Sequence, residues 1–222
     1  MTTTKGTPLP RARMTGKQRR EQLLGIGRTL FAQKGFEGTT VEEIAAQARV
    51  SKPVVYEHFG GKEGLYAVVV DREMEVLLGL ITKALTSAGS PYALVERAAL
   101  ALLDYIESSS DGFRILVRDS PMGQSTGSFA TLISDITRQV EYLLVEEFRQ
   151  RGLDPLTAPM YAQMLVGMVA LCGQWWLDSP RRPKEEVAAH VVNLAWNGLS
   201  RVEPNPRLRE RRPGEDQRSH PS

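Results

Sequence analysis

The sequence predicts an all-α protein in which a small N-terminal three-helix domain with a helix-turn-helix precedes a larger helical bundle. Three observations support this fold class. Apolar residues recur at spacings of three and four from about residue 17 to residue 203. No segment of strand length alternates strictly between apolar and polar residues. Near the N-terminus, two short helical patterns are separated by only three residues.

We expect four segments along the 222 residues. Residues 1–16 and 204–222 are rich in Pro, Arg, Gly and Ser and lack periodicity, which predicts disordered tails. The helix-turn-helix domain should occupy residues 17–62, and the bundle should occupy residues 63–203. The chain is long enough for these domains to bury a core.

The first helix should span residues 17–34, where apolar residues form one stripe. Gly35 follows at the position that favours a left-handed backbone. Phe36 can then fold back onto Phe31, so we expect the helix to end in a Schellman-type stop.

The second helix should begin after Thr40, because Thr40-Val-Glu-Glu43 has the pattern of a capping box. Ser51 can cap a third, short helix, which tolerates Pro53 in its first turn and should end at Phe59.

Six further helices should build the bundle. Their expected ranges are 62–85, 91–108, 112–119, 128–150, 156–177 and 184–201. The segment 121–127 is rich in Gly and Ser and predicts a loop. The last two helices are apolar on more than one side, which is typical of helices buried in a core or against another subunit. We therefore expect a dimer interface there.

Residues 158–177 carry no formal charge, over about the length of a membrane span. Interrupting Pro, Gln and Gly residues and flanking arginines favour a buried or interface helix instead. The first 16 residues lack the apolar stretch of an export signal. We expect a cytoplasmic protein that does not enter a membrane.

Composition excludes several classes of site. The single cysteine, Cys172, excludes a disulfide framework and an all-cysteine zinc site. The three histidines, His58, His190 and His220, are far apart in the sequence, so no pair has the local spacing of metal ligands. The sequence predicts neither a metal nor a cofactor.

Charge is distributed unevenly along the chain, although the formal net charge is only +2. Residues 1–60 contain ten Lys or Arg and five Asp or Glu, whereas residues 61–203 contain thirteen and eighteen. A basic N-terminal part on an acidic body is typical of a protein whose N-terminal part meets a polyanion. A solvated charged surface without a partner would give the same counts.

Helical geometry predicts the faces of the third helix. Val55 and Phe59 are four residues apart and should face inward. The outer side of its N-terminal end, which a recognition helix presents to base edges, then carries Lys52, Pro53, Val54 and Tyr56. Lysine can donate to guanine or to phosphate, and the two apolar residues can touch a thymine methyl. The Tyr56 hydroxyl and the His58 imidazole suit phosphate oxygens.

The segment GFEGTTVEEIAAQARVSKPVVYEHFGGKEGLY, from Gly35 to Tyr66, resembles the DNA-binding segment of the TetR family of bacterial transcriptional regulators. With the preceding helix, the resemblance covers residues 17 to about 66. It implies an all-helical homodimer that binds double-stranded DNA at a palindromic operator and carries a ligand-binding and dimerisation domain. Repression relieved by an effector is the usual mode of the family, although the residues do not distinguish it from activation.

The resemblance also implies roles by position. Ser51, Lys52, Pro53 and Val54 would lie nearest the bases, and Thr40, Tyr56, His58 and Lys62 would bind phosphates. Arg49 departs from the family by standing in a turn that more often holds glycine. A left-handed backbone there costs about 1–2 kcal/mol, which a contact between Arg49 and phosphate can offset. Val54 is apolar where small polar residues are common, so it offers no hydrogen bond to a base. Lys17, in the first turn of the first helix, is a further phosphate candidate or part of a solvated face.

A serine hydrolase is the alternative reading. The motif G-x-S-x-G at residues 123–127 contains Ser125, and Asp154 or Asp178 and then His190 follow in the chain order of a catalytic triad. A nucleophile elbow requires a strand directly before it, but the preceding residues are polar and broken by a proline. We therefore expect no enzyme, and keep as the alternative a helical small-molecule-binding protein or hydrolase without a DNA role.

Apolar and aromatic side chains of the bundle are candidates for an effector site. They are Tyr105, Phe113, Met122, Phe129, Met164, Met168 and Trp175. Clustered charge is lacking in these helices, which favours a small apolar or amphipathic effector. Dimer contact is the competing use of the last two helices, where the candidates are Met168, Trp176, Val192 and Trp196.

Overall fold

The computed structural model describes residues 14–118 and 129–207. Within these ranges every regular element is helical, so the predicted all-α class is confirmed. The elements are α1 (Gly16–Lys34), α2 (Val41–Ala48), α3 (Lys52–Phe59), α4 (Lys62–Thr86), α5 (Pro91–Ser108), α6 (Ser110–Val117), α7 (Phe129–Gln150), the 3₁₀ turn η1 (Pro155–Thr157), α8 (Ala158–Asp178) and α9 (Lys184–Ser200). Most of the predicted tails, the predicted loop at 121–127, Met122 and Ser125 lie outside the described residues.

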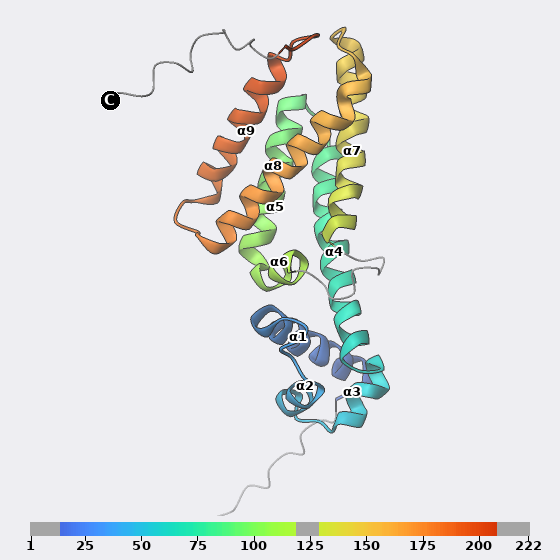
Figure 1. The fold of residues 1–222 in the computed structure, drawn as a ribbon. Helices are drawn as coiled ribbons and strands as arrows, with labels where there is room; N and C mark the ends of the chain where they lie inside the picture. The colour runs from blue at the N-terminus through green and yellow to red at the C-terminus, as the bar shows by residue number, and fades with distance from the viewer. Residues whose placement is uncertain (1–13, 119–128, 208–222) are drawn as a thin grey trace, which may run out of the picture.

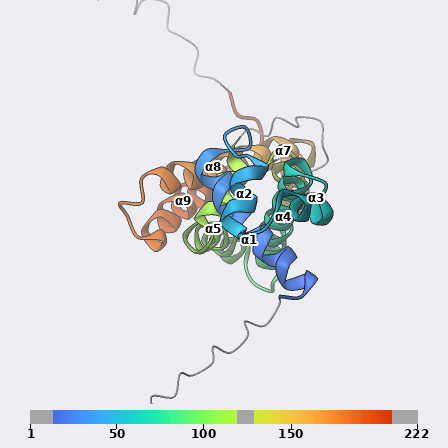
Figure 2. The same cartoon turned by 90° about the horizontal axis from the view of Figure 1, so that it is seen from below.

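The two parts of the molecule are stacked along one long helix. Helices α1, α2 and α3 form the small part at the bottom of Figure 1, and α5 to α9 form the bundle above it. Helix α4 starts beside α3 and continues upward into the bundle. Viewed from below, α1, α2 and α3 lie in front of the bundle helices (Figure 2).

Packing between helices far apart in sequence holds the bundle together. Helix α7 packs along α8, α5 packs along α9, and α4 contacts both α5 and α7. One cluster of buried apolar residues is continuous from α1 through α4 to α5 and α6. Gly27 of α1 permits the close approach of α4, because a Cβ atom there would lie 2.8 Å from Cδ2 of Leu65. The two parts therefore share a core.

Local capping explains where several helices begin. The predicted capping box is confirmed: Thr40 Oγ1 accepts a hydrogen bond from the amide of Glu43 at 3.2 Å, and the Glu43 carboxylate accepts from the amide of Thr40. A second capping box joins Thr15 to Gln18 at the start of α1. Ser51 is the N-cap of α3, but its side chain makes no capping hydrogen bond, which corrects that expectation.

Three helix ends differ in detail from those predicted: the stop after α1, the start of α6 and the start of α8. At Gly35, φ is 75° and ψ is 176°, which is not the left-handed helical conformation of a Schellman stop, although the rings of Phe31 and Phe36 do stack with centroids 6.3 Å apart. Helix α6 begins at Ser110, separated from the end of α5 at Ser108 by Ser109 alone, rather than at residue 112. The 3₁₀ turn η1 precedes α8, because Asp154 accepts a hydrogen bond from the amide of Leu156.

The segment Pro155–Asp178 is long and apolar enough to cross a membrane by length and composition alone. In the structure, its helix α8 packs along α7 and also contacts α5 and α9. Its inner residues, among them Ala162, Val166 and Trp176, are buried against the rest of the chain. This packing is that of a bundle helix.

Candidate nucleic-acid interface and effector cavity

Helices α2 and α3 form the predicted helix-turn-helix around a small apolar core. Val55 of α3 and Ile44 of α2 are fully buried. In the turn, the amide of Val50 donates to the carbonyl of Ala45 at 3.0 Å. Arg49 has φ 55° and ψ 47°, the left-handed conformation anticipated at this position. The turn therefore fixes α3 across α2 with its N-terminal end exposed.

The exposed end of α3 carries most of the residues predicted to meet DNA. Ser51, Lys52 and Pro53 are exposed, and Tyr56 has 54% of its surface accessible. Val54 does not point fully outward as expected: it is half-buried and packs against the core. His58 is also half-buried, in the last turn of α3.

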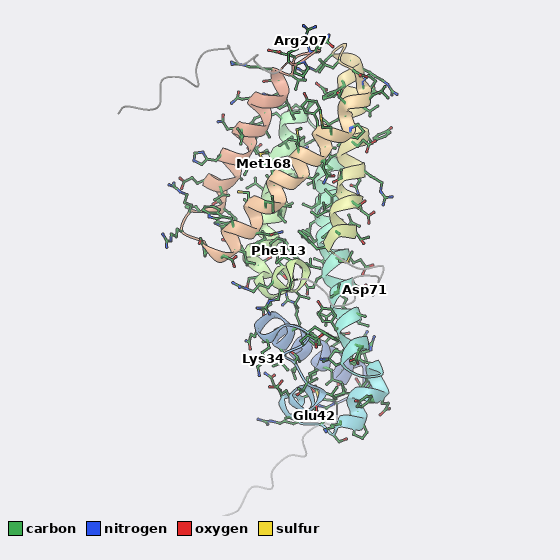
Figure 3. All side chains as sticks on the ribbon, viewed as in Figure 1. Lys34, Glu42, Asp71, Phe113, Met168 and Arg207 are labelled. Atoms are coloured by element: carbon green, nitrogen blue, oxygen red, sulfur yellow. The ribbon has the colours of Figure 1, made fainter. Side chains whose placement is uncertain are left out.

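An ion pair occupies the exposed N-terminal end of α3. The ammonium of Lys52 contacts the Glu42 carboxylate in the first turn of α2, and both side chains are more than half exposed. The hydrogen bond from Lys52 lowers the pKa of Glu42 below its ordinary value. Figure 3 places Glu42 at the end of the molecule that carries α2 and α3. The Lys52 ammonium is therefore already paired with a carboxylate in this structure.

The residues predicted to bind phosphate fall into two groups. Lys17, Thr40 and Arg49 are exposed, although the Thr40 side chain also caps α2. Lys62 is half-buried instead: its ammonium donates to the carbonyl of Phe36 at 3.1 Å and lies 4.1 Å from the centre of that ring. Lys62 thus joins the start of α4 to the loop after α1.

Sequence reasoning missed Arg20 as a structural residue. Its guanidinium donates to the carbonyl of His58 at 2.9 Å and lies 4.3 Å above the ring of Phe59. These contacts hold the C-terminal end of α3 on α1 and so fix the orientation of the exposed end. The basic start of α1 was visible in the sequence, but the partner residues nearly forty positions away were not.

A cavity of about 340 Å³ lies within the bundle. Its lining is almost entirely aliphatic and aromatic and comes from α4, α5, α6, α7, α8 and α9. The polar residues of the lining, apart from the indole of Trp196, all lie at the C-terminal end of α7 or just beyond it: Tyr142, Glu146, Glu147, Gln150 and Arg151. The cavity is therefore an apolar space with one polar end.

Two of the predicted effector residues line this cavity, Phe113 and Phe129, with their rings edge to face at 6.1 Å. Tyr105 is buried next to Phe113, but it is not part of the lining. Met164 and Trp175 are on the surface of α8, and Met168 packs between α5 and α9 residues, so none of the three lines the cavity. Trp196, expected at the dimer interface, lines it and stacks edge to face with Tyr92.

Helices α8 and α9 expose a row of large apolar side chains. Its members are Met160, Met164, Leu171, Trp175 and Leu194. Two residues expected at a dimer interface are not part of it. Val192 is only 1% exposed, and Trp176 is buried with its indole donating to the carbonyl of Arg182 at 2.9 Å. Both are covered by their own chain.

Comparison with known proteins agrees with this architecture. Residues 23–69 match the family described as bacterial regulatory proteins, tetR family. Residues 91–198 match the family described as tetracyclin repressor-like, C-terminal domain. The HTH-type transcriptional activator FasR of Mycolicibacterium smegmatis is 30% identical over 200 residues, which cover 89% of this chain and 88% of FasR. The chain belongs to the TetR family.

Solved structures show the same TetR fold. A TetR-like transcriptional regulator from Rhodococcus sp. RHA1 has a TM-score of 0.72 at 24% identity, covering 86% of this chain and all of that one. AibR, solved in complex with isovaleryl coenzyme A and operator DNA, has a TM-score of 0.66 at 20% identity, covering 79% of this chain and 97% of AibR. Relatives of this TetR-family chain include proteins named as activators and proteins named as repressors.

As a member of the TetR family, the protein is a DNA-binding transcriptional regulator and not an enzyme. The hydrolase alternative is therefore wrong, and its Ser125 lies outside the described residues. Over residues 14–118 and 129–207, no group of three or more His, Cys, Asp or Glu side chains is placed to hold a metal.

The left-handed turn of this TetR-family domain allows a first prediction. Replacing Arg49→Gly should raise the free energy of unfolding by about 0.5–1 kcal/mol, because relief of the left-handed strain exceeds the entropic cost of glycine. The same change at the exposed helical Gln47 should lower it by a similar amount. Urea unfolding of the two variants measures the difference, and destabilisation by both would contradict the prediction.

Proposed function

We propose that the protein is a homodimeric repressor that leaves its operator when an amphipathic small molecule with a long apolar chain fills the bundle cavity. The cavity is the observation that carries this proposal, because it is large, apolar and polar only at one end. Pockets of this size are typical of small-molecule sites in helical bundles. The domains are proposed to divide at residues 62 and 63, and the protein to act in the cytoplasm.

The shape of the lining favours a chain over a compact molecule. Along α5 alone, lining residues run from Pro91 to Leu102, about 16 Å at the helical rise per residue. Phe113 of α6 and Phe129 at the start of α7 also line the cavity, and they offer no hydrogen-bonding group. An apolar chain would fill this length, and a polar head would remain with Glu146, Gln150 and Arg151. Acyl thioesters, the class to which the ligand in the AibR structure belongs, have this division into chain and head.

The exposed apolar row on α8 and α9 supports the homodimer. Met160, Met164, Leu171 and Trp175 recur at helical spacing on one side of α8, and Leu194 of α9 adds to them. An apolar surface of this kind on a soluble protein is typical of a protein interface. A second copy would cover it by pairing the same helices, as an isologous dimer does.

The proposed dimer would present two copies of α3 to the two halves of a palindromic operator. Half-sites about 34–36 Å apart place both reading helices in successive major grooves on one side of the duplex. Ser51, Lys52, Pro53 and Val54 are proposed to approach the bases. Phosphates are proposed to meet Tyr56, His58, Thr40, Arg49 and Lys17, with Lys62 acting through its position at the start of α4.

Palmitoyl-coenzyme A and acetyl-coenzyme A test the proposal, since the two probes share a head and differ in chain length. DNA fragments selected from a random library by the protein itself provide the operator. Fluorescence anisotropy should show that palmitoyl-coenzyme A lowers the affinity for DNA at least about 5-fold, the lower range of allosteric couplings, while acetyl-coenzyme A does not. Tighter DNA binding with the long-chain probe would contradict release from the operator.

The cavity wall supplies a matched pair of variants. Ala98 lines the cavity, so Ala98→Phe should fill part of it and lower the affinity for palmitoyl-coenzyme A about 10-fold or more. Ala130 is exposed near the start of α7, so Ala130→Phe adds the same ring outside the cavity and should leave the affinity unchanged. Isothermal titration calorimetry measures both, and equal affinities would show that the probe binds elsewhere.

A further inference from the structure

Four polar side chains meet where the DNA-binding part joins the bundle. Arg28 of α1 donates from Nε to Glu73 Oε1 of α4 at 2.6 Å. The other carboxylate oxygen accepts from the Tyr105 hydroxyl of α5 at 2.5 Å and from the hydroxyl of Ser109 at 3.3 Å. Ser109, between α5 and α6, also accepts from the Arg28 guanidinium. We name Arg28, Glu73, Tyr105 and Ser109 the junction cluster.

The centre of the junction cluster is largely shielded from solvent. The Glu73 side chain is 12% exposed, and Tyr105 is almost completely buried. Burial and the hydrogen bond to Glu73 raise the pKa of Tyr105, so its hydroxyl remains a neutral donor. Each buried polar group depends on the others for its hydrogen bonds, because a lost partner leaves an unsatisfied group. In the structure the cluster is closed, because all of these hydrogen bonds are formed.

The cluster also touches the wall of the effector cavity. The ring of Phe113 lies edge to face with Tyr105, with centroids 6.4 Å apart, and Phe113 is part of the cavity lining. Figure 3 shows Phe113 at the end of the bundle that faces α1. Gly112 beside it leaves room for the cluster, because a Cβ atom there would lie 1.9 Å from Glu73 Oε2 and 2.7 Å from the Tyr105 oxygen. Movement of Phe113 and movement of the cluster are thus linked by direct contact.

A second ion pair also joins α1 to α4, but its side chains share no hydrogen bond with the junction cluster and no ring contact with Phe113. Arg72 of α4 binds the Glu21 carboxylate of α1 through two hydrogen bonds, at 2.7 and 2.9 Å. Both side chains are about half exposed. Exposed pairs of this kind contribute little to stability. Breaking the pair between Glu21 and Arg72 therefore shows what the loss of any ion pair between α1 and α4 does, without a change in the junction cluster.

We propose that the junction cluster is the switch through which the cavity controls the DNA-binding part. When the cavity is empty, the closed cluster holds α1 and the three-helix domain in one orientation on α4 to α6. A chain that displaces Phe113 separates Tyr105 from Glu73 and frees that orientation. Tyr105 and Glu73 are then positioning residues, which contact neither DNA nor effector. This inference rests on the proposed effector function of the cavity.

The first experiment needs no effector. Spin labels are attached at Gln47→Cys in α2 and Glu96→Cys in α5 of a Cys172→Ser protein, and labelled chains are diluted with unlabelled chains so that distances within one chain dominate. Pulsed electron paramagnetic resonance should give a narrow distribution of the distance between the two labels in the parent protein. Tyr105→Phe or Glu73→Gln should give a distinctly broader or shifted distribution. The control Glu21→Gln should retain the narrow distribution. An unchanged distribution in Tyr105→Phe and Glu73→Gln overturns the proposal.

The second experiment measures coupling. Palmitoyl-coenzyme A should lower the DNA affinity of the parent and of Glu21→Gln at least about 5-fold, but that of Tyr105→Phe less than 2-fold, although Tyr105→Phe still binds the probe. Full coupling in Tyr105→Phe overturns the proposal, because the cluster would then have only a structural role. If the distances change in the first experiment and the probe has no effect on the parent, the cluster is an orientation device and the proposed effector class is wrong.

Discussion

Replacing Tyr56→Ala is expected to lower operator affinity about 100-fold or more. A hydrogen bond to a charged phosphate is worth about 1.5–3 kcal/mol, and a symmetric dimer would lose two of them. Tyr56 is one of the most exposed side chains of the reading helix, so the free energy of unfolding should change by no more than about 0.5 kcal/mol. Fluorescence anisotropy on the selected DNA fragment measures the affinity.

Two further variants separate the hydroxyl from the ring. Tyr56→Phe should reproduce most of the loss, because only the phosphate donor is removed. Tyr142 is an even more exposed tyrosine, on α7 and far from α3, so Tyr142→Ala should bind DNA as the parent does. Parent-like affinity of Tyr56→Ala would show that the exposed face of α3 is not the surface that meets DNA.

The second large effect is expected at Gly64, in the first turn of α4. A Cβ atom at Gly64 would lie 1.9 Å from the carbonyl oxygen of Phe59 and 3.0 Å from its carbonyl carbon, so the backbone at the end of α3 must move. We expect Gly64→Ala to lower the free energy of unfolding by about 3 kcal/mol. DNA affinity should fall as well, because α3 is displaced relative to α1 and α4.

Gly79 of the same helix is the matched control for this substitution. It is exposed, and a Cβ atom there would have no neighbour within 4 Å. Gly79→Ala should therefore raise the free energy of unfolding by about 0.5–1 kcal/mol, the usual gain inside a helix. Urea unfolding at one fixed protein concentration compares the two variants. A stabilising Gly64→Ala would mean that the turn between α3 and α4 is looser than the structure shows.

Much of the fold was predictable because local signals mark helix ends. The Thr40 capping box fixed the start of α2, and the glycine pair at Gly60 fixed the end of α3, where φ is 73°. The start of α6 was misplaced because Ser109 serves both α5 and α6 without a capping hydrogen bond. Such a start has no signature in the residue order.

The candidate sites were predictable only in part, for a different reason. An apolar helix with two buried sides gives the same periodicity whether it meets its own chain or a partner, so the sequence did not reveal that Val192 and Trp176 are buried by their own chain. The contact of Arg28 with Glu73 spans 45 positions and follows from how α1 crosses α4. No local pattern predicts a contact of that separation.

The ion pair between Lys52 and Glu42 has a consequence for the ionic strength dependence of DNA binding. A free lysine that binds phosphate releases a condensed cation from the duplex, which adds about 0.9 to the slope of log affinity against log salt. In the proposed complex Lys52 must first leave Glu42, so part of its attraction to phosphate is lost in breaking this ion pair. Salt screens the exposed pair between Lys52 and Glu42 as well as the duplex, so Lys52 should contribute less to that slope than a free lysine does.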